Sequence, residues 1–368
     1  MRSRRRLVAA GGLAAVALAA GAGPSPAATL EPIAPGAHPT AATVAPAVGY
    51  RDRVITAPPR ALTSAVTQRS ATGLYRAPDG RVVEVTTSGS FADTPETRAA
   101  AQSFVDFLGS RLHGAELSRL RVFIGTNPEI NALCGGGRGV LGCYASAASR
   151  MLIPASDPPG GGAFTREYVL THEYGHHIAR HRSNFPFPAL NYGPKYWASH
   201  EYVCDNAYRG RLAPGNQGAR YLDDPGEGFA DAYAHLHYPG VPWQFAGILF
   251  PNAGSFAAIR RDVLAPWVTQ RRGALRGYAG RFTRSRSYVV PVTLDGILQL
   301  RLIGPARSNL DLEIVSRGRV LVRSSVPGSR DTLAIRVCRA GLPVVRPVVR
   351  VVRRTGGGVF TLLTARPG

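Results

Sequence analysis

The chain has 368 residues, of which 45% are hydrophobic and 18% charged, which supplies a sizeable core and excludes a wholly disordered chain. Its 42 glycines and 29 prolines follow no G-x-y period, so a collagen-like rod and a long coiled coil are excluded. The formal net charge is +21, which could indicate a nucleic-acid partner. Lys195 is the only lysine, so the positive charge is almost all arginine, and the arginines are scattered along the chain instead of clustered. We therefore expect no specific nucleic-acid partner.

The first 28 residues have the pattern of a cleavable export signal. Arginines within 2–6 form a basic head, an apolar run follows at 7–22, and small residues at 26–28 suit cleavage. The apolar run is shorter than the roughly 20 residues that a membrane span needs, so we expect no transmembrane segment in the mature protein. The arginine-rich head also resembles a twin-arginine signal. The sequence therefore predicts a secreted, extracellular protein.

The rest of the chain divides into three parts by composition and pattern. Residues 29–59 are rich in Ala, Pro and Thr with little periodic hydrophobicity, which predicts a flexible leader or pro-segment. Residues 60–272 mix helix and strand patterns, which predicts an α+β domain, and 285–368 show the short alternating runs of a small all-β sandwich. In the α+β domain we expect helices at 96–112, 165–181, 227–237 and 255–267, and strands at 82–86, 120–124 and 149–153.

Export would place the four cysteines in an oxidising compartment, where an even number favours two disulfides. Cys134 and Cys143 bracket the glycines at 135–137 and would close that loop locally, which leaves Cys204 to pair with Cys338. All three connectivities remain open from the sequence. The chain has no C-x-x-C pair, so a cysteine zinc site is not expected.

The predicted helix at 165–181 contains His172-Glu173-Tyr174-Gly175-His176, an H-E-x-x-H motif. One helical turn separates His172 from His176, so both imidazoles emerge on one face and can bind a single Zn²⁺. Glu173 lies beside that face, where its carboxylate can accept a proton from the attacking water. A histidine-rich solvated helix face is the alternative interpretation, which the additional His177 and His181 support.

A catalytic zinc ion needs a third protein ligand. Ala179 and Arg182 stand where the longer motif H-E-x-x-H-x-x-G-x-x-H requires Gly and His, which excludes the metzincin arrangement. Farther along, Glu227 and Asp231 lie four residues apart in the helix that opens after a Pro-Gly turn, so they face the same way. An ordinary acidic first turn is the alternative interpretation. Further candidates for the third ligand are Asp224, Asp205 and Glu201.

Roughly residues 120–270 resemble the gluzincin metallopeptidases, the thermolysin-like clan of zinc enzymes, and the resemblance is concentrated in the two helices that carry the H-E-x-x-H motif and Glu227. The resemblance implies a zincin-like catalytic domain in which His172, His176 and Glu227 bind Zn²⁺ and Glu173 is the general base. It also implies that Asp231 holds the second ring nitrogen of the first histidine.

The same resemblance implies a cleft that binds an extended peptide, with the strand ending at Ile153 lying along it. A further side chain should donate a hydrogen bond to the oxyanion that forms during hydrolysis. The candidates are His235 and Tyr233, followed by His237, Tyr238 and Tyr221, and the sequence does not select among them.

The segment from about 288 to the end resembles the bacterial pre-peptidase C-terminal domain. The resemblance is carried by three stretches, which are Asn309-Leu310-Asp311-Leu312, Ser324-Ser325 and the closing Gly-Val-Phe-Thr-Leu. Such domains accompany secreted peptidases. Arginines alternate with valines within 346–354, which predicts a basic outer face on a strand. That face could contact an anionic cell wall or simply be solvated.

Together these patterns predict a secreted zinc metallopeptidase that hydrolyses peptide bonds in a peptide or protein substrate. The alternative is an exported binding or cell-surface protein whose zincin-like core is inactive or holds a purely structural metal.

Overall fold

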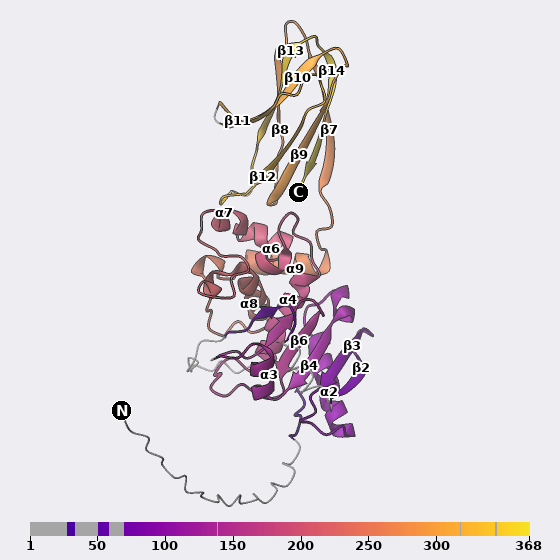
Figure 1. Ribbon diagram of the computed structural model, residues 1–368, viewed down its shortest axis with the longest axis vertical. Coiled ribbons are helices and arrows are strands. Elements are labelled where there is room, and N and C mark those ends of the chain that lie inside the picture. Colours follow the sequence, from indigo (N-terminus) through magenta and orange to yellow (C-terminus); the bar gives the residue numbers. More distant parts are fainter. Residues whose placement is uncertain (1–27, 34–50, 59–69, 138, 317, 343) are drawn as a thin grey trace, which may run out of the picture.

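The computed structural model describes residues 28–33, 51–58, 70–137, 139–316, 318–342 and 344–368. A unit of helices and sheet lies next to a long sandwich of strands (Figure 1), which confirms the predicted α+β class with a β-sandwich. Within the described residues, no helix combines the length and the apolar character that crossing a membrane requires. The predicted export signal lies outside the described residues, apart from Ala28.

The first unit contains a six-stranded mixed sheet with the order β1-β5-β6-β4-β3-β2. Strands β3, β4 and β6 run parallel, whereas β2 and β5 are antiparallel to their neighbours β3 and β6. The short strand β1 pairs in parallel with β5 at the end of the sheet. The strands are β1 (Val54–Ile55), β2 (Ala71–Arg76), β3 (Val82–Thr87), β4 (Arg121–Gly125), β5 (Cys143–Ala145) and β6 (Arg150–Pro154).

This order corrects the expectation for the strand that ends near Ile153. That strand is β6, and it lies between β4 and β5, so its backbone groups are already paired on both sides. Strand β5 is also paired on both sides, with β6 and with the two-residue strand β1, and it is too short for its pattern to be recognised in the sequence.

Alternating side chains of the sheet serve two separate cores. Val122 and Ile124 of β4 point into the larger core, which they share with helix α2 (Pro95–Gly109) and helix α4 (Arg166–Arg180). Phe123 points the other way, into a smaller core with helix α3 (Asn127–Leu133). This two-residue alternation places α4 on one face of the sheet.

Two helices of this unit carry the motifs found in the sequence. Thr165 caps α4, and its side chain accepts a hydrogen bond from Tyr168 N; Asp224 caps α8 (Pro225–His237) and accepts from Gly226 N. Such side-chain caps satisfy backbone N–H groups that the helix itself leaves unpaired. The remaining helices are α5 (Ala189–Tyr192), α6 (Lys195–His200), α7 (Val203–Tyr208) and α9 (Ala253–Leu264).

The C-terminal sandwich consists of two antiparallel four-stranded sheets, β11-β10-β13-β8 and β12-β9-β14-β7. Alternate residues such as Leu310, Leu312 and Leu362 fill the core between them. Strand β7 begins at Arg271, ahead of the expected boundary at 285. The strands are β7 (Arg271–Ala279), β8 (Ser285–Val289), β9 (Gly296–Ile303), β10 (Asn309–Ser316), β11 (Arg319–Ser324), β12 (Thr332–Val337), β13 (Val348–Thr355) and β14 (Gly358–Arg366).

Both expected disulfides are present, Cys134–Cys143 in the glycine-rich loop and Cys204–Cys338 between α7 and the sandwich. The single lysine also joins the two units, because Lys195 Nζ donates to Phe185 O at 2.7 Å and to Asp295 O at 2.8 Å. The Lys195 side chain is fully buried. Covalent and hydrogen-bonded contacts therefore hold the sandwich against the helices.

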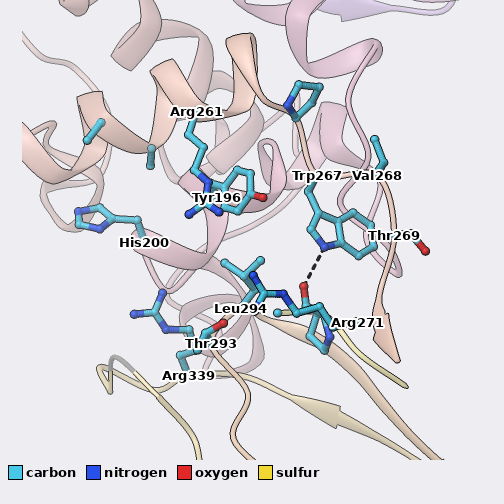
Figure 2. A pocket seen from close by; sticks show the side chains of 15 residues that line it. Tyr196, His200, Arg261, Trp267, Val268, Thr269, Arg271, Thr293, Leu294 and Arg339 are labelled. Atoms are coloured by element: carbon cyan, nitrogen blue, oxygen red, sulfur yellow. Dashed lines mark hydrogen bonds between the residues drawn. The ribbon is translucent and has the colours of Figure 1, made fainter. Parts of the chain in front are cut away.

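A pocket of about 650 Å³ lies at this junction, between α6, α9 and the sandwich (Figure 2). Trp267 Nε1 donates to Pro367 O across it at 2.8 Å, and the Arg261 guanidinium lies 3.8 Å from the ring centroid of Tyr196. Its lining residues include none of the residues that the sequence predicts to bind zinc.

Parts of the predicted leader are folded against the first unit. Leu30 and Ile33 are buried, and Arg166 of α4 donates hydrogen bonds to the backbone oxygens of Glu31 and Pro32. Residues 51–58 include strand β1. Both segments therefore differ from the flexible leader expected over 29–59, because tertiary contacts order a stretch that has no periodic pattern of its own.

Candidate metal centre

Helix α4 presents the H-E-x-x-H motif to the interior of the protein. His172 and His176 are fully buried, and their ring centroids lie 5.0 Å apart. The spacing of four residues places both rings on the side of α4 that faces α8. The solvated histidine face considered from the sequence is therefore wrong for these two residues.

Helix α8 brings an acid to the same point. Glu227 Oε2 lies 3.1 Å from His176 Nε2 and 3.5 Å from His172 Nε2. The two helices approach closely because Gly175 has no side chain, since a Cβ atom there would lie 2.7 Å from the Cα of Ala230. The glycine inside the motif thus permits the contact that brings Glu227 to the histidines.

A fourth group comes from a residue that the sequence did not indicate. Asp52 Oδ2 lies 2.7 Å from His172 Nε2 and 3.0 Å from His176 Nε2, and its side chain is fully buried. Asp52 stands just before β1, far from the motif in sequence, in a segment without periodicity. One donor atom from each of Asp52, His172, His176 and Glu227 lies within 4.8 Å of the others, so this cluster could hold a metal ion.

Neighbouring side chains fix the orientation of the cluster. Asp231 Oδ1 lies 3.4 Å from His172 Nδ1 and accepts a hydrogen bond of 2.5 Å from Tyr168. Gln217 Nε2 donates to Glu227 Oε1 at 2.6 Å. Partners of this kind hold the ring and the carboxylate in the orientation that a metal ion requires.

The charges in the cluster shift the pKa values of its members. Burial raises the pKa of Asp52, but the two imidazolium charges outweigh burial and hold it well below its usual range. Burial lowers the pKa of His176, whereas the Glu227 and Asp52 carboxylates raise it to about 10. Imidazole nitrogens bind a metal ion in their neutral form, so metal binding at this cluster is expected to depend on pH.

Glu173 differs from the other acids of the site. Its carboxylate is fully buried, and neither oxygen has a hydrogen-bond partner among the described residues. Burial raises the pKa of Glu173 well above its usual range, and the negative charge of Asp52 raises it further. A buried carboxyl group without partners costs stability, and such groups are concentrated at functional sites.

The two residues preferred as oxyanion donors have partners elsewhere. Tyr233 donates to Leu112 O at 2.6 Å, and His235 Nδ1 lies 3.3 Å from Asp231 O. Tyr221, a lesser candidate, lies beside the cluster instead, because its hydroxyl donates to Asp52 Oδ1 and is 3.4 Å from Glu227 Oε2.

The other candidate ligands also have different partners. Asp224 caps α8, Asp205 pairs with Arg209 at 2.8 Å, and Glu201 accepts from Ser255 at 2.5 Å. His177 Nε2 lies 2.9 Å from Glu116 O, and burial lowers the pKa of His177 to about 3. Of all the candidates, Glu227 alone joins the two motif histidines in the donor cluster found among the described residues.

Comparisons with known proteins add little to this geometry. No protein-family model matches the chain, and no curated protein matches it. Among solved structures, the chain is similar to the pre-peptidase C-terminal domain of collagenase from Bacillus anthracis, with 9% sequence identity and a TM-score of 0.22. The match covers 25% of this chain and 88% of that domain. A likeness of this size carries no functional argument, so the function rests on the site itself.

Proposed function

We propose that the protein is a secreted zinc peptidase of the gluzincin type, in which His172, His176 and Glu227 hold the metal and Glu173 is the general base. The observation that carries the proposal is the buried Glu173 carboxylate, which lies beside a cluster of metal-binding groups and has no hydrogen-bond partner among the described residues. A group that only supported the fold would be expected to have such partners.

The donor set fits zinc in both chemistry and spacing. Imidazole nitrogens and carboxylate oxygens are common zinc ligands, and bond lengths of about 2.0–2.1 Å in a tetrahedron separate neighbouring ligands by about 3.3 Å. The distances from Asp52 and Glu227 to the two histidine Nε2 atoms range from 2.7 to 3.5 Å. These values bracket the edge of a zinc tetrahedron.

Each residue of the site has a distinct task in peptide hydrolysis. When bound, zinc polarises the scissile carbonyl and lowers the pKa of water toward ~7. Glu173 accepts the proton of the attacking water and passes it to the departing amine. Asp231 keeps the His172 ring in place, and the Tyr221 hydroxyl, next to the position that Asp52 occupies, donates to the developing oxyanion.

Export and the C-terminal sandwich complete this proposal. Two disulfides are compatible with an extracellular protein. The sandwich would accompany the catalytic unit as a domain of the pre-peptidase C-terminal type, and its exposed arginines could contact an anionic cell wall.

A second function has a specific observation in its favour. Four protein ligands are the number that structural zinc sites use, and Asp52 supplies the fourth group in the structure. In this alternative the protein is an exported binding or cell-surface protein, and Asp52 is a permanent ligand. The alternative gives no role to Glu173.

Activity assays distinguish the two functions. The assay uses the zinc-loaded full chain with two substitutions, Asp52→Ala and Val54→Pro, and we call this variant the released background. Asp52→Ala frees the fourth position at the metal. Val54→Pro removes the Val54 N–H that donates to Gln217. We expect this chain to cleave internally quenched peptides. Adding Glu173→Gln should lower kcat by about 10²–10⁴-fold with zinc content unchanged.

Glu167→Gln in the same background is the matched control, because Glu167 lies on α4 but pairs with Arg166. It should retain activity. Hydrolysis that persists with Glu173→Gln, or its absence from the zinc-loaded released background, contradicts the proposed function.

A further inference from the structure

Residues 51–56, which include strand β1, lie along the side of β5 that faces away from β6. Leu141 N donates to Arg51 O at 3.2 Å, Tyr144 N to Arg53 O at 3.0 Å, and Ser146 N to Ile55 O at 2.9 Å. These contacts use backbone groups only, so they would accept an extended peptide of many sequences.

The opposite side of the same segment is held by the loop that precedes α8. Val54 N donates to Gln217 Oε1 at 3.1 Å, and Asp52 N donates to the Tyr221 hydroxyl at 3.2 Å. The segment therefore lies between β5 and this loop, with its backbone hydrogen-bonded on both sides.

The segment itself reaches the donor cluster. Within the segment, Asp52 is fully buried and directs its carboxylate to His172 and His176, whereas the neighbouring Arg51 is exposed. The Asp52 carboxylate thus occupies the position that a substrate carbonyl must take if the site is to cleave a peptide.

Asp52 is attached to the fold in a different way from the other three groups. His172, His176 and Glu227 belong to α4 and α8, which are held together by the large core. Asp52 belongs to a segment whose only strand, β1, has two residues and pairs with β5 alone. Local opening of a fold is expected first at short edge segments, so a release of Asp52 would leave the two helices in place.

We propose that residues 51–56 act as an internal ligand that keeps the chain latent, and that the space between β5 and the loop at 216–221 binds extended peptides once this segment leaves it. The inference rests on the proposed function. Asp52 takes the fourth position at the metal, and the segment's backbone covers the edge that a substrate needs. A tethered ligand competes at an effective concentration in the millimolar range or above, so free peptides bind only after the segment leaves.

The test compares the zinc-loaded wild-type chain, the released background and the control Asp223→Ala, whose aspartate pairs with Arg220 at the surface. The first measurement is the binding of acetohydroxamate, a small zinc ligand that needs a free coordination position, by calorimetry. The second is hydrogen exchange at the amides of Leu141, Tyr144 and Ser146. Neither measurement depends on catalysis.

In the released background we expect at least tenfold tighter hydroxamate binding, at least tenfold faster exchange at these three amides, and at least tenfold faster peptide hydrolysis. The Asp223→Ala control should match the wild type in all three. Bound zinc should remain at one per chain in every variant.

Three results have different meanings. If the wild type binds hydroxamate and cleaves peptides as well as the released background, the latency proposal is overturned and the peptidase stands. If the released background loses zinc, Asp52 is a permanent ligand and the latency proposal is overturned. If hydroxamate binding and exchange change as expected but no variant cleaves peptides, the blocking segment stands and the proposed function fails.

Discussion

Two buried glutamates of the same unit should respond in opposite directions when replaced by methionine. Glu173 has no hydrogen-bond partner among the described residues, whereas Glu116 accepts from Gly114 N at 2.7 Å, Tyr174 Oη at 3.0 Å and Arg182 Nη2 at 2.5 Å. An unsatisfied buried polar group costs about 1–3 kcal/mol. In metal-free protein, Glu173→Met should therefore raise the free energy of unfolding by about that amount.

Glu116→Met is the matched comparison, because it removes a carboxylate of similar burial and leaves Arg182 without its charge partner. Breaking a buried pair in this way should lower the free energy of unfolding by about 3–5 kcal/mol. Each kcal/mol corresponds to about 2–4 °C in Tm for a unit of this size, so calorimetry in EDTA resolves both changes. If Glu173→Met lowers Tm as much as Glu116→Met does, Glu173 stabilises the fold, and its burial does not indicate a catalytic role.

Three further predictions concern other parts of the molecule. Asp231→Asn should weaken zinc binding by about 10–100-fold in a chelator competition, and unchanged affinity would remove its orienting role. Lys195→Met leaves two carbonyl oxygens without their donor and should lower the free energy of unfolding in urea by about 1–3 kcal/mol; a neutral result would contradict this. Replacing the cysteines of Cys204–Cys338, which are 134 residues apart, by serines should lower the free energy of unfolding by about 5 kcal/mol. The same change at Cys134–Cys143, with a separation of 9, should lower it by about 2.6 kcal/mol, because a shorter loop loses less entropy on closure. Equal losses would refute this loop-entropy account.

The parts of the site that depend on local geometry could be predicted from the sequence. The spacing of His172 and His176 fixes their common face once α4 is a helix, because a helix repeats every 3.6 residues. The Pro-Gly pair before Glu227 likewise indicated where this helix starts, although the structure includes both residues in the first turn of α8. Its proximity to the histidines followed from a family resemblance, and the structure places it there through the close contact at Gly175.

The fourth group could not be predicted, for a physical reason. Asp52 reaches the cluster through a parallel pairing between the two-residue strand β1 and the three-residue strand β5, and neither is long enough to show alternation. Strand β7 was missed for a related reason, since most of its side chains are exposed and no apolar repeat marks it. Pairings between short segments far apart in the sequence leave no local signal.

The most direct test of the central claim is anomalous diffraction at the zinc edge from crystals of the zinc-loaded chain. The account predicts one strong peak at about 2.0–2.2 Å from His172 Nε2, His176 Nε2 and a carboxylate oxygen of Glu227. A chain without zinc at this position, or a peak from which the Glu227 side chain is turned away, would contradict the account.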